Sequence, residues 1–154
     1  MNMGMYTGKL KYKLTDAISF MVNSPKAYVG FEPYVLDDNR FVTTVKNEDG
    51  IYLPLRFLSD NFGGEVSYDD TTGIVTVKYA ENEMQFNLRI KNIDKNFILV
   101  ENRVLILTET AEKLYSKKSD VYENGIVILS DNGNIILDDE INLLSEIERR
   151  LSNN

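Results

Sequence analysis

The chain has 154 residues, of which 24 are acidic and 17 basic, for a net charge of −7. It contains neither histidine nor cysteine, which excludes disulfides, cysteine-bound zinc, iron–sulfur clusters and any catalytic triad that uses either residue. The acidic balance argues against nucleic acid as the main partner, because that binding depends on many Lys and Arg contacts to phosphate.

The first predicted element is a half-buried strand over residues 6–14, with a lysine-rich outer face. Its apolar residues alternate with polar ones, the period of two that is typical of strands. They are Tyr6, Leu10, Tyr12 and Leu14. The same period predicts a second strand over residues 18–22, before a turn.

The next segment is predicted to be irregular in places. Strands are expected over residues 27–29 and 41–45. Between them, Pro33 lacks a backbone N–H, so the chain up to Leu36 is expected to be an edge strand or an irregular crossing.

Residues 51–77 predict a strand, a helix and a hairpin. A short strand over residues 51–53 leads to Pro54, which suits the first turn of a helix because its missing N–H is not needed there. Leu55, Leu58 and Phe62 have the spacing of one helical face, and Gly63 ends the helix. A hairpin loop at residues 69–73 then joins two strands.

This unit recurs in weaker form. Residues 104–107 stand 53 positions after residues 51–54, and the same offset aligns Tyr115 with Phe62. Thr108 is the predicted N-cap of a second short helix. Two copies of one supersecondary unit explain these matches; two unrelated helix–hairpin segments are the alternative.

A C-terminal helix is predicted over residues 138–152, with Asp138 and Asp139 at its start. Its apolar stripe consists of Ile141, Leu144, Ile147 and Leu151. The expected fold class is therefore α+β: an antiparallel β-sheet with short helices, two degenerate strand–helix–hairpin repeats and a C-terminal helix. We expect one compact domain over residues 1–154, with the repeats at 18–79 and 83–130.

The segments 52–59, 62–69 and 73–77 together resemble the motif of the copper amine oxidase N-terminal-like (stalk) domain family. That motif is an aliphatic strand running into Val-Pro-Leu-Arg-Phe, a helix ending in glycine, an aromatic-Asp turn and an aliphatic strand. Here Leu53 replaces the usual valine and Tyr68 the usual tryptophan. The similarity is strong over residues 18–79 and loose over residues 83–130.

The resemblance implies a non-catalytic stalk, binding or spacer module of a secreted or surface-exposed bacterial protein, with protein or cell-wall polysaccharide as partner. No cofactor is expected, since the oxidase copper site needs three histidines. The sequence opens with no leader pattern and contains no apolar run near the roughly 20 residues of a membrane span, so neither a signal peptide nor membrane insertion is expected. An extracytoplasmic location is implied by the resemblance alone.

The candidate site residues fall into a structural motif and a tentative binding surface. Arg56 is expected to tie the first helix to Asp69 or Asp70, with anion binding as its alternative role. The structural motif residues are Pro54, Leu55, Arg56, Gly63, Asp69 and Gly73. The tentative binding surface is a set of tyrosines that could stack on sugar rings or pack on a protein: Tyr28, Tyr34, Tyr52 and Tyr79.

Two further functions stay open. A carboxylate-based polysaccharide hydrolase is conceivable from residue types, although the acidic clusters lie at turns and helix starts and none has calcium-loop spacing. A homo-oligomerisation domain is the other, suggested by strand edges and by the stripe of the C-terminal helix.

Overall fold

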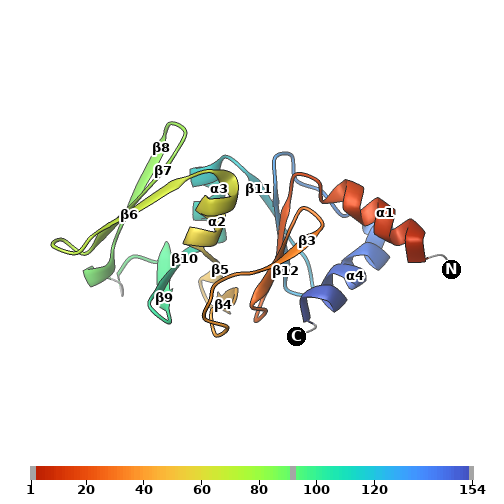
Figure 1. Cartoon of the computed structure of the whole chain (residues 1–154), viewed down its shortest axis with the longest axis horizontal. Coiled ribbons are helices and arrows are strands. Elements are labelled where there is room, and N and C mark those ends of the chain that lie inside the picture. Colours follow the sequence, from red (N-terminus) through yellow and green to blue (C-terminus); the bar gives the residue numbers. More distant parts are fainter. Residues whose placement is uncertain (1–2, 91–92, 153–154) are drawn as a thin grey trace.

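The computed structural model describes residues 3–90 and 93–152, and that part of the chain forms three antiparallel sheets with four α-helices (Figure 1). The helices are α1 (Met3–Lys13), α2 (Leu55–Phe62), α3 (Thr108–Tyr115) and α4 (Ile141–Ser152), with short 3-10 turns η1 (Leu88–Ile90) and η2 (Asp138–Glu140). The α+β class, the antiparallel sheets and the C-terminal helix are as expected. No helix in the described ranges is long and apolar enough to cross a bilayer.

The strands divide into sheets of five, four and three. The five-stranded sheet has the order β11 (Lys118–Val121), β12 (Ile126–Ser130), β1 (Ile18–Met21), β2 (Lys26–Val29), β3 (Glu32–Val35). The four-stranded sheet has the order β4 (Val45–Asn47), β5 (Gly50–Pro54), β10 (Arg103–Leu107), β9 (Phe97–Val100). The three-stranded sheet has the order β6 (Glu65–Asp69), β7 (Ile74–Tyr79), β8 (Asn82–Asn87).

The two sequence repeats meet in the four-stranded sheet. β5 and β10 pair antiparallel, and Leu53 lies opposite Ile106, its counterpart 53 positions later. An antiparallel pair centred on equivalent residues defines a local two-fold axis. The flanking strands β4 and β9 obey the same relation, and α2 and α3 follow β5 and β10 directly. The repeats are thus related by approximate two-fold symmetry.

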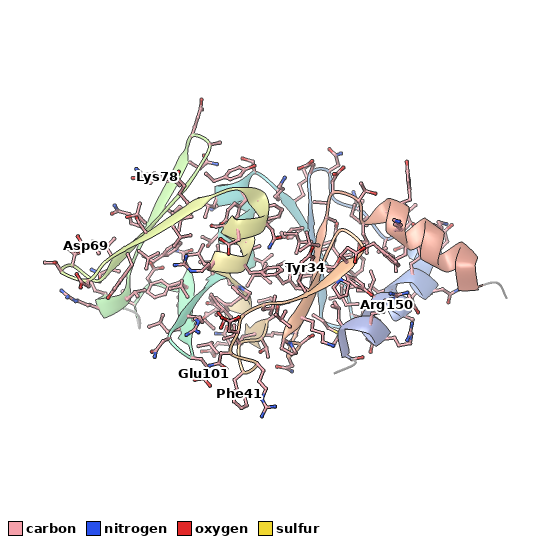
Figure 2. All side chains as sticks on the ribbon, in the orientation of Figure 1. Tyr34, Phe41, Asp69, Lys78, Glu101 and Arg150 are labelled. Atoms are coloured by element: carbon pink, nitrogen blue, oxygen red, sulfur yellow. The ribbon has the colours of Figure 1, made fainter. Side chains whose placement is uncertain are left out.

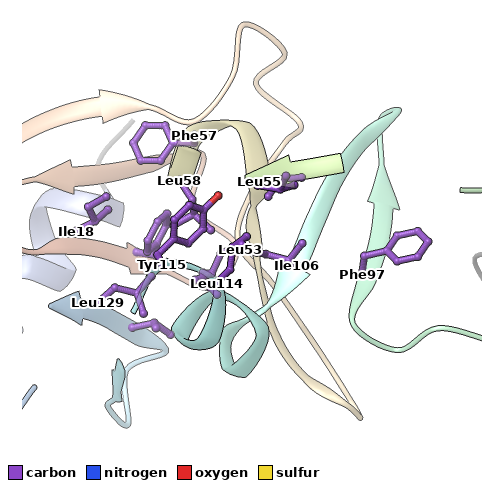
Figure 3. Close-up of a cluster of buried hydrophobic side chains, with 14 of the residues drawn as sticks. Ile18, Leu53, Leu55, Phe57, Leu58, Phe97, Ile106, Leu114, Tyr115 and Leu129 are labelled. Atoms are coloured by element: carbon purple, nitrogen blue, oxygen red, sulfur yellow. The ribbon is translucent and has the colours of Figure 1, made fainter. Parts of the chain in front are cut away.

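The helices of the two repeats pack together around equivalent aromatic residues. The rings of Phe62 and Tyr115 lie 5.3 Å apart, and the ring of Tyr79 approaches Tyr115 at 5.4 Å. Ser59 Oγ and the Tyr115 hydroxyl are hydrogen-bonded in a buried position. Burial raises the pKa of Tyr115 to about 12. Figure 3 shows this centre, with Tyr115 between Leu58, Leu114 and Leu129.

The five-stranded sheet is covered on both faces, which explains why every residue of β12 is buried. Val127 and Leu129 face the main core, whereas Ile126 and Ile128 face a second cluster made with α1 and α4. Figure 1 shows α1 and α4 together at one end of the molecule, beyond this sheet. At the C-terminal end of α4, Ser24 Oγ donates a hydrogen bond to the Leu151 carbonyl at 2.6 Å.

The predicted first strand is wrong, because the structure has α1 there. Leu10 and Leu14 are fully buried while Tyr12 is 80% exposed, so the apolar face repeats at i, i+4 rather than at i, i+2. Lys9 and Lys13 share the same spacing and both bind the Glu140 carboxylate, at 2.8 and 2.9 Å. Two buried leucines and two lysines that bind Glu140, each pair four positions apart, therefore attach α1 to the rest of the protein.

Three smaller expectations also need correction. The strand expected over residues 41–45 begins only at Val45, since the preceding residues form a turn and an irregular crossing. Thr108 is the first helical residue rather than the N-cap, and its hydroxyl donates to the Ile51 carbonyl at 2.7 Å. Ile141 is 62% exposed, and Leu143 takes its place in the buried stripe. The expected edge strand around Pro33 is present as β3.

Candidate functional site

The family-like motif places α2 directly at the end of β5. Pro54 is the last residue of β5 and precedes the helix, which begins at Leu55 with no side-chain cap. Gly63 ends the helix with φ 94° and donates its N–H to the Ser59 carbonyl at 2.8 Å. A residue with a side chain would be strained at that angle, so the predicted glycine stop has a physical cause.

The first turn of α2 borders an apolar groove of about 440 Å³. The groove is also lined by the β3–β4 connection, by one face of the β6–β7 hairpin and by the β9–β10 hairpin. Its floor includes Leu55 and Leu36, which are buried, and its walls include Val66 and Val104, which are half-buried. Tyr68 stands at its edge and is 57% exposed. Figure 2 shows Phe41 and Glu101, from two of these segments, at the same edge of the molecule.

An ion pair lies on the rim of the groove. Arg103 Nε donates to Asp37 Oδ2 at 2.9 Å, and Arg103 Nη1 donates to the Glu101 carbonyl at 3.0 Å. The hydrogen bond from Arg103 lowers the pKa of Asp37 below its usual value, against the opposing effect of burial. Among the described residues that line the groove, Asp37 is the only one with a carboxylate.

Arg56 also lines the groove but is exposed, and it makes no hydrogen bond or ion pair with any residue in the described ranges. The expected tie from Arg56 to Asp69 or Asp70 is therefore absent. The hairpin loop is held instead by Arg89, whose Nη2 donates to the Asp70 carbonyl at 3.0 Å. Arg89 comes from η1, for which no sequence pattern predicted a role.

Replacing Arg56 with Met tests this correction. Because the side chain is exposed and unpartnered, we expect the free energy of unfolding to change by less than about 0.5 kcal/mol. Urea unfolding of the wild type and the variant measures it. A loss of more than about 1.5 kcal/mol would mean that Arg56 holds the helix to another element after all.

The remaining motif residues shape the β6–β7 hairpin. Asp69 Oδ1 accepts the Thr71 N–H at 2.9 Å, and the Asp69 carbonyl accepts the Gly73 N–H at 2.8 Å. Gly73 has φ 77°, and a Cβ there would lie 2.9 Å from the Arg89 side chain. Asp69 and Gly73 therefore have local turn roles and do not contribute to the groove lining.

The four tyrosines do not form one surface. Tyr28 and Tyr52 are buried, at 1% and 0% exposed, so the expectation that they bind a partner is wrong. Tyr52 donates its hydroxyl to the Lys95 carbonyl at 2.7 Å, and Tyr79 is half-buried against Tyr115. Only Tyr34 of these four is exposed, at 50%, on the edge strand β3 and far from Asp69 in Figure 2.

The second repeat has no matching groove chemistry. At the offset of 53 positions, Glu109 stands where Arg56 does, so the charge is reversed. Thr108 and Thr110 replace Leu55 and Phe57, and both are buried with their hydroxyls bonded within the fold. The groove lies beside the helix of the first repeat, and the β9–β10 hairpin of the second repeat forms one of its walls.

Comparison of the sequence with models of known protein families gives a match. The model of the copper amine oxidase N-terminal domain matches residues 21–141. The chain belongs to this family. The match covers the first repeat from residue 21 onward and all of the second repeat, and it ends at the start of α4, so α1 and most of α4 lie outside it. No curated protein and no solved structure matches the chain.

The family name refers to copper, but the residues present do not provide a copper site. The sequence has no histidine or cysteine, and the described ranges contain no group of three or more acidic side chains that could hold a metal. The family is a non-catalytic accessory domain. The groove is the candidate functional site, and Arg56 on its lining has no ion-pair partner in the part of the chain that the structure describes.

Proposed function

We propose that this chain is a non-catalytic binding module of the bacterial cell surface or of a secreted protein, and that the groove beside α2 is its contact site. Membership of an accessory-domain family supports the non-catalytic role. The observation that carries the binding role is the groove itself, an apolar hollow with a polar rim, which is the usual anatomy of a specific binding surface.

The groove lies away from the two terminal helices. α1 and α4 lie side by side at one end of the molecule, whereas β6 and β9 lie toward the other end (Figure 1).

The hydrolase alternative receives no specific support. Two catalytic carboxylates must face each other across a bound sugar. The groove offers only Asp37, which Arg103 already binds. The homo-oligomerisation alternative stays a prediction, and light scattering at high protein concentration tests it.

A retention assay tests the proposal. The immobilised chain is exposed separately to isolated bacterial cell-wall polymer and to surface-protein extract. We expect one of the two fractions to be retained by the wild type, and less of it by Arg56→Glu. Glu109→Gln, at the equivalent position of the second repeat, is the matched control and should behave as the wild type. Retention of neither fraction would leave only a spacer role.

A further inference from the structure

The unpartnered charge of Arg56 restricts what can occupy the groove. Arg103, the other cation of the rim, is neutralised by Asp37 at 2.9 Å. Arg56 has no such partner in the described ranges. A ligand carboxylate would give this guanidinium a charge-assisted, two-pronged hydrogen bond, for which the planar fork of arginine is well suited.

The ligand must also bring apolar groups. Leu55 and Leu36 form a buried floor, and the half-buried walls of Val66, Leu99 and Val104 remain partly open to water. Filling this space with a bulky side chain removes apolar surface from water, worth roughly 25 cal/mol per Å². The ring of Tyr68, half exposed at the edge, can cover such a side chain from above.

The net charge of the protein favours a ligand with few acidic residues. The chain carries a net charge of −7, so the overall charge of the protein disfavours a polyacidic segment. One carboxylate beside apolar side chains fits both the local and the global charge. The rim also includes the exposed side chains of Asn102 and Arg103, which can donate hydrogen bonds to the carbonyl groups of a peptide backbone. A hydrocarbon acid has no such carbonyl groups and would leave these donors unused.

We propose that the groove binds an extended segment of a partner protein that places one or two bulky apolar side chains between α2 and the β9–β10 hairpin, and an adjacent Asp or Glu carboxylate on Arg56. This inference rests on the proposed function, because it names the ligand chemistry of the same site. The second repeat provides an internal contrast, since Glu109 there would repel the same carboxylate.

Peptide selection tests the proposal. Random eight-residue peptides displayed on phage are selected on the wild-type chain and counter-selected on Arg56→Glu. We expect the enriched peptides to share an acidic residue next to Leu, Ile, Phe, Tyr or Trp. In fluorescence anisotropy, Arg56→Gln should weaken the best peptide about tenfold, which corresponds to one charge-assisted hydrogen bond. Glu109→Gln should change the affinity less than twofold.

Three results would overturn the proposal. The first is enrichment of no peptide, or of peptides without an acid. The second is equal affinity for the wild type and Arg56→Gln, whose folding is checked by urea unfolding. The third is binding of octanoate, seen as shifts of the Val66 and Val104 methyl resonances, in the absence of peptide binding.

The retention assay distinguishes failure of the peptide-site proposal from failure of the proposed function. If Arg56→Glu retains a surface fraction as well as the wild type does, the peptide site is wrong but a binding module remains. If neither protein retains any fraction and no peptide is selected, both conclusions fail together.

Discussion

Replacing Tyr115 with Ala is expected to destabilise the protein by about 4 kcal/mol, within the usual range for a buried aromatic residue. The side chain is fully buried at the junction of the two repeats, where its ring contacts Phe62 and Tyr79 and its hydroxyl pairs with Ser59. The variant loses the packing of both helices and leaves the Ser59 hydroxyl without a partner. Urea or thermal unfolding measures the loss.

Two milder variants separate packing from hydrogen bonding. Tyr115→Phe keeps the ring but orphans the buried Ser59 hydroxyl, so we expect a cost of about 1–2 kcal/mol. Adding Ser59→Ala should recover part of that cost, because removing both partners leaves no unsatisfied group. If Tyr115→Ala cost less than about 1 kcal/mol, the repeat junction would not be the centre of the core.

The sequence predicted the elements that proline and glycine delimit. Gly63 ends α2 and Gly73 lies in the β6–β7 turn, because each takes a positive φ that few other residues adopt without strain. Pro54 was expected in the first turn of α2, but it is the last residue of β5 and has an extended backbone. The second repeat was predictable from its fixed offset despite losing these residues. Its helix ends at Ser116, which takes the same left-handed conformation as Gly63 with φ 56°.

The helix α1 was predicted as a strand because two residues four positions apart fall on the same face of either structure. Leu10 and Leu14 are compatible with both a strand and a helix, and only the exposure of Tyr12 separates the two. The partner of the shared lysine face, Glu140, lies more than 120 positions away along the chain. A pattern confined to residues 6–14 therefore could not decide between the two structures.

The groove could not have been predicted for a related reason. Asp37 and Arg103 form its rim pair although 66 positions separate them, and no local pattern links the β3–β4 connection to the β9–β10 turn. The sequence did single out Arg56, but with the wrong role. A tie to the hairpin was the simpler expectation, whereas Arg56 has no hydrogen-bond or ion-pair partner among the described residues and lies at the edge of an apolar groove.

Sheet order was likewise beyond local patterns. In the first repeat, β8 follows β7 directly and pairs with it, whereas the equivalent neighbour of β12 is β1, from the start of the chain. The second repeat is completed by the N-terminal strand. Strand β1 pairs with β12 on one side and with β2 on the other. It therefore joins the N-terminal part of the chain to the second repeat.

Replacing Glu140 with Gln is expected to cost about 2 kcal/mol at pH 7. Glu140 is 6% exposed, binds both Lys9 and Lys13, and accepts the Leu137 N–H at 3.1 Å. It therefore joins α1 to the start of α4. Glutamine keeps the shape and one acceptor but loses the charge that both lysines require, and charged hydrogen bonds are worth about 1.5–3 kcal/mol.

This contribution should depend on pH. The hydrogen bond from Lys9, with that from Lys13, holds the pKa of Glu140 at about 2, below its ordinary value of 4.5. A carboxyl whose pKa is depressed by folding contributes stability that is complete above its unfolded pKa and is lost as the pH falls toward the folded value. The stability gap between the wild type and Glu140→Gln should thus be constant above about pH 5 and shrink between about pH 4.5 and 2.

An exposed pair provides the control for this experiment. Lys78 and Glu83 lie 3.6 Å apart with both side chains more than half exposed, so Glu83→Gln should change stability by less than about 0.5 kcal/mol at any pH. Tyr122, whose pKa is raised mainly by burial and slightly by Glu140, ionises only at alkaline pH and does not interfere. A gap for Glu140→Gln that stays constant down to pH 3 would show that packing, rather than the charge on Glu140, attaches α1.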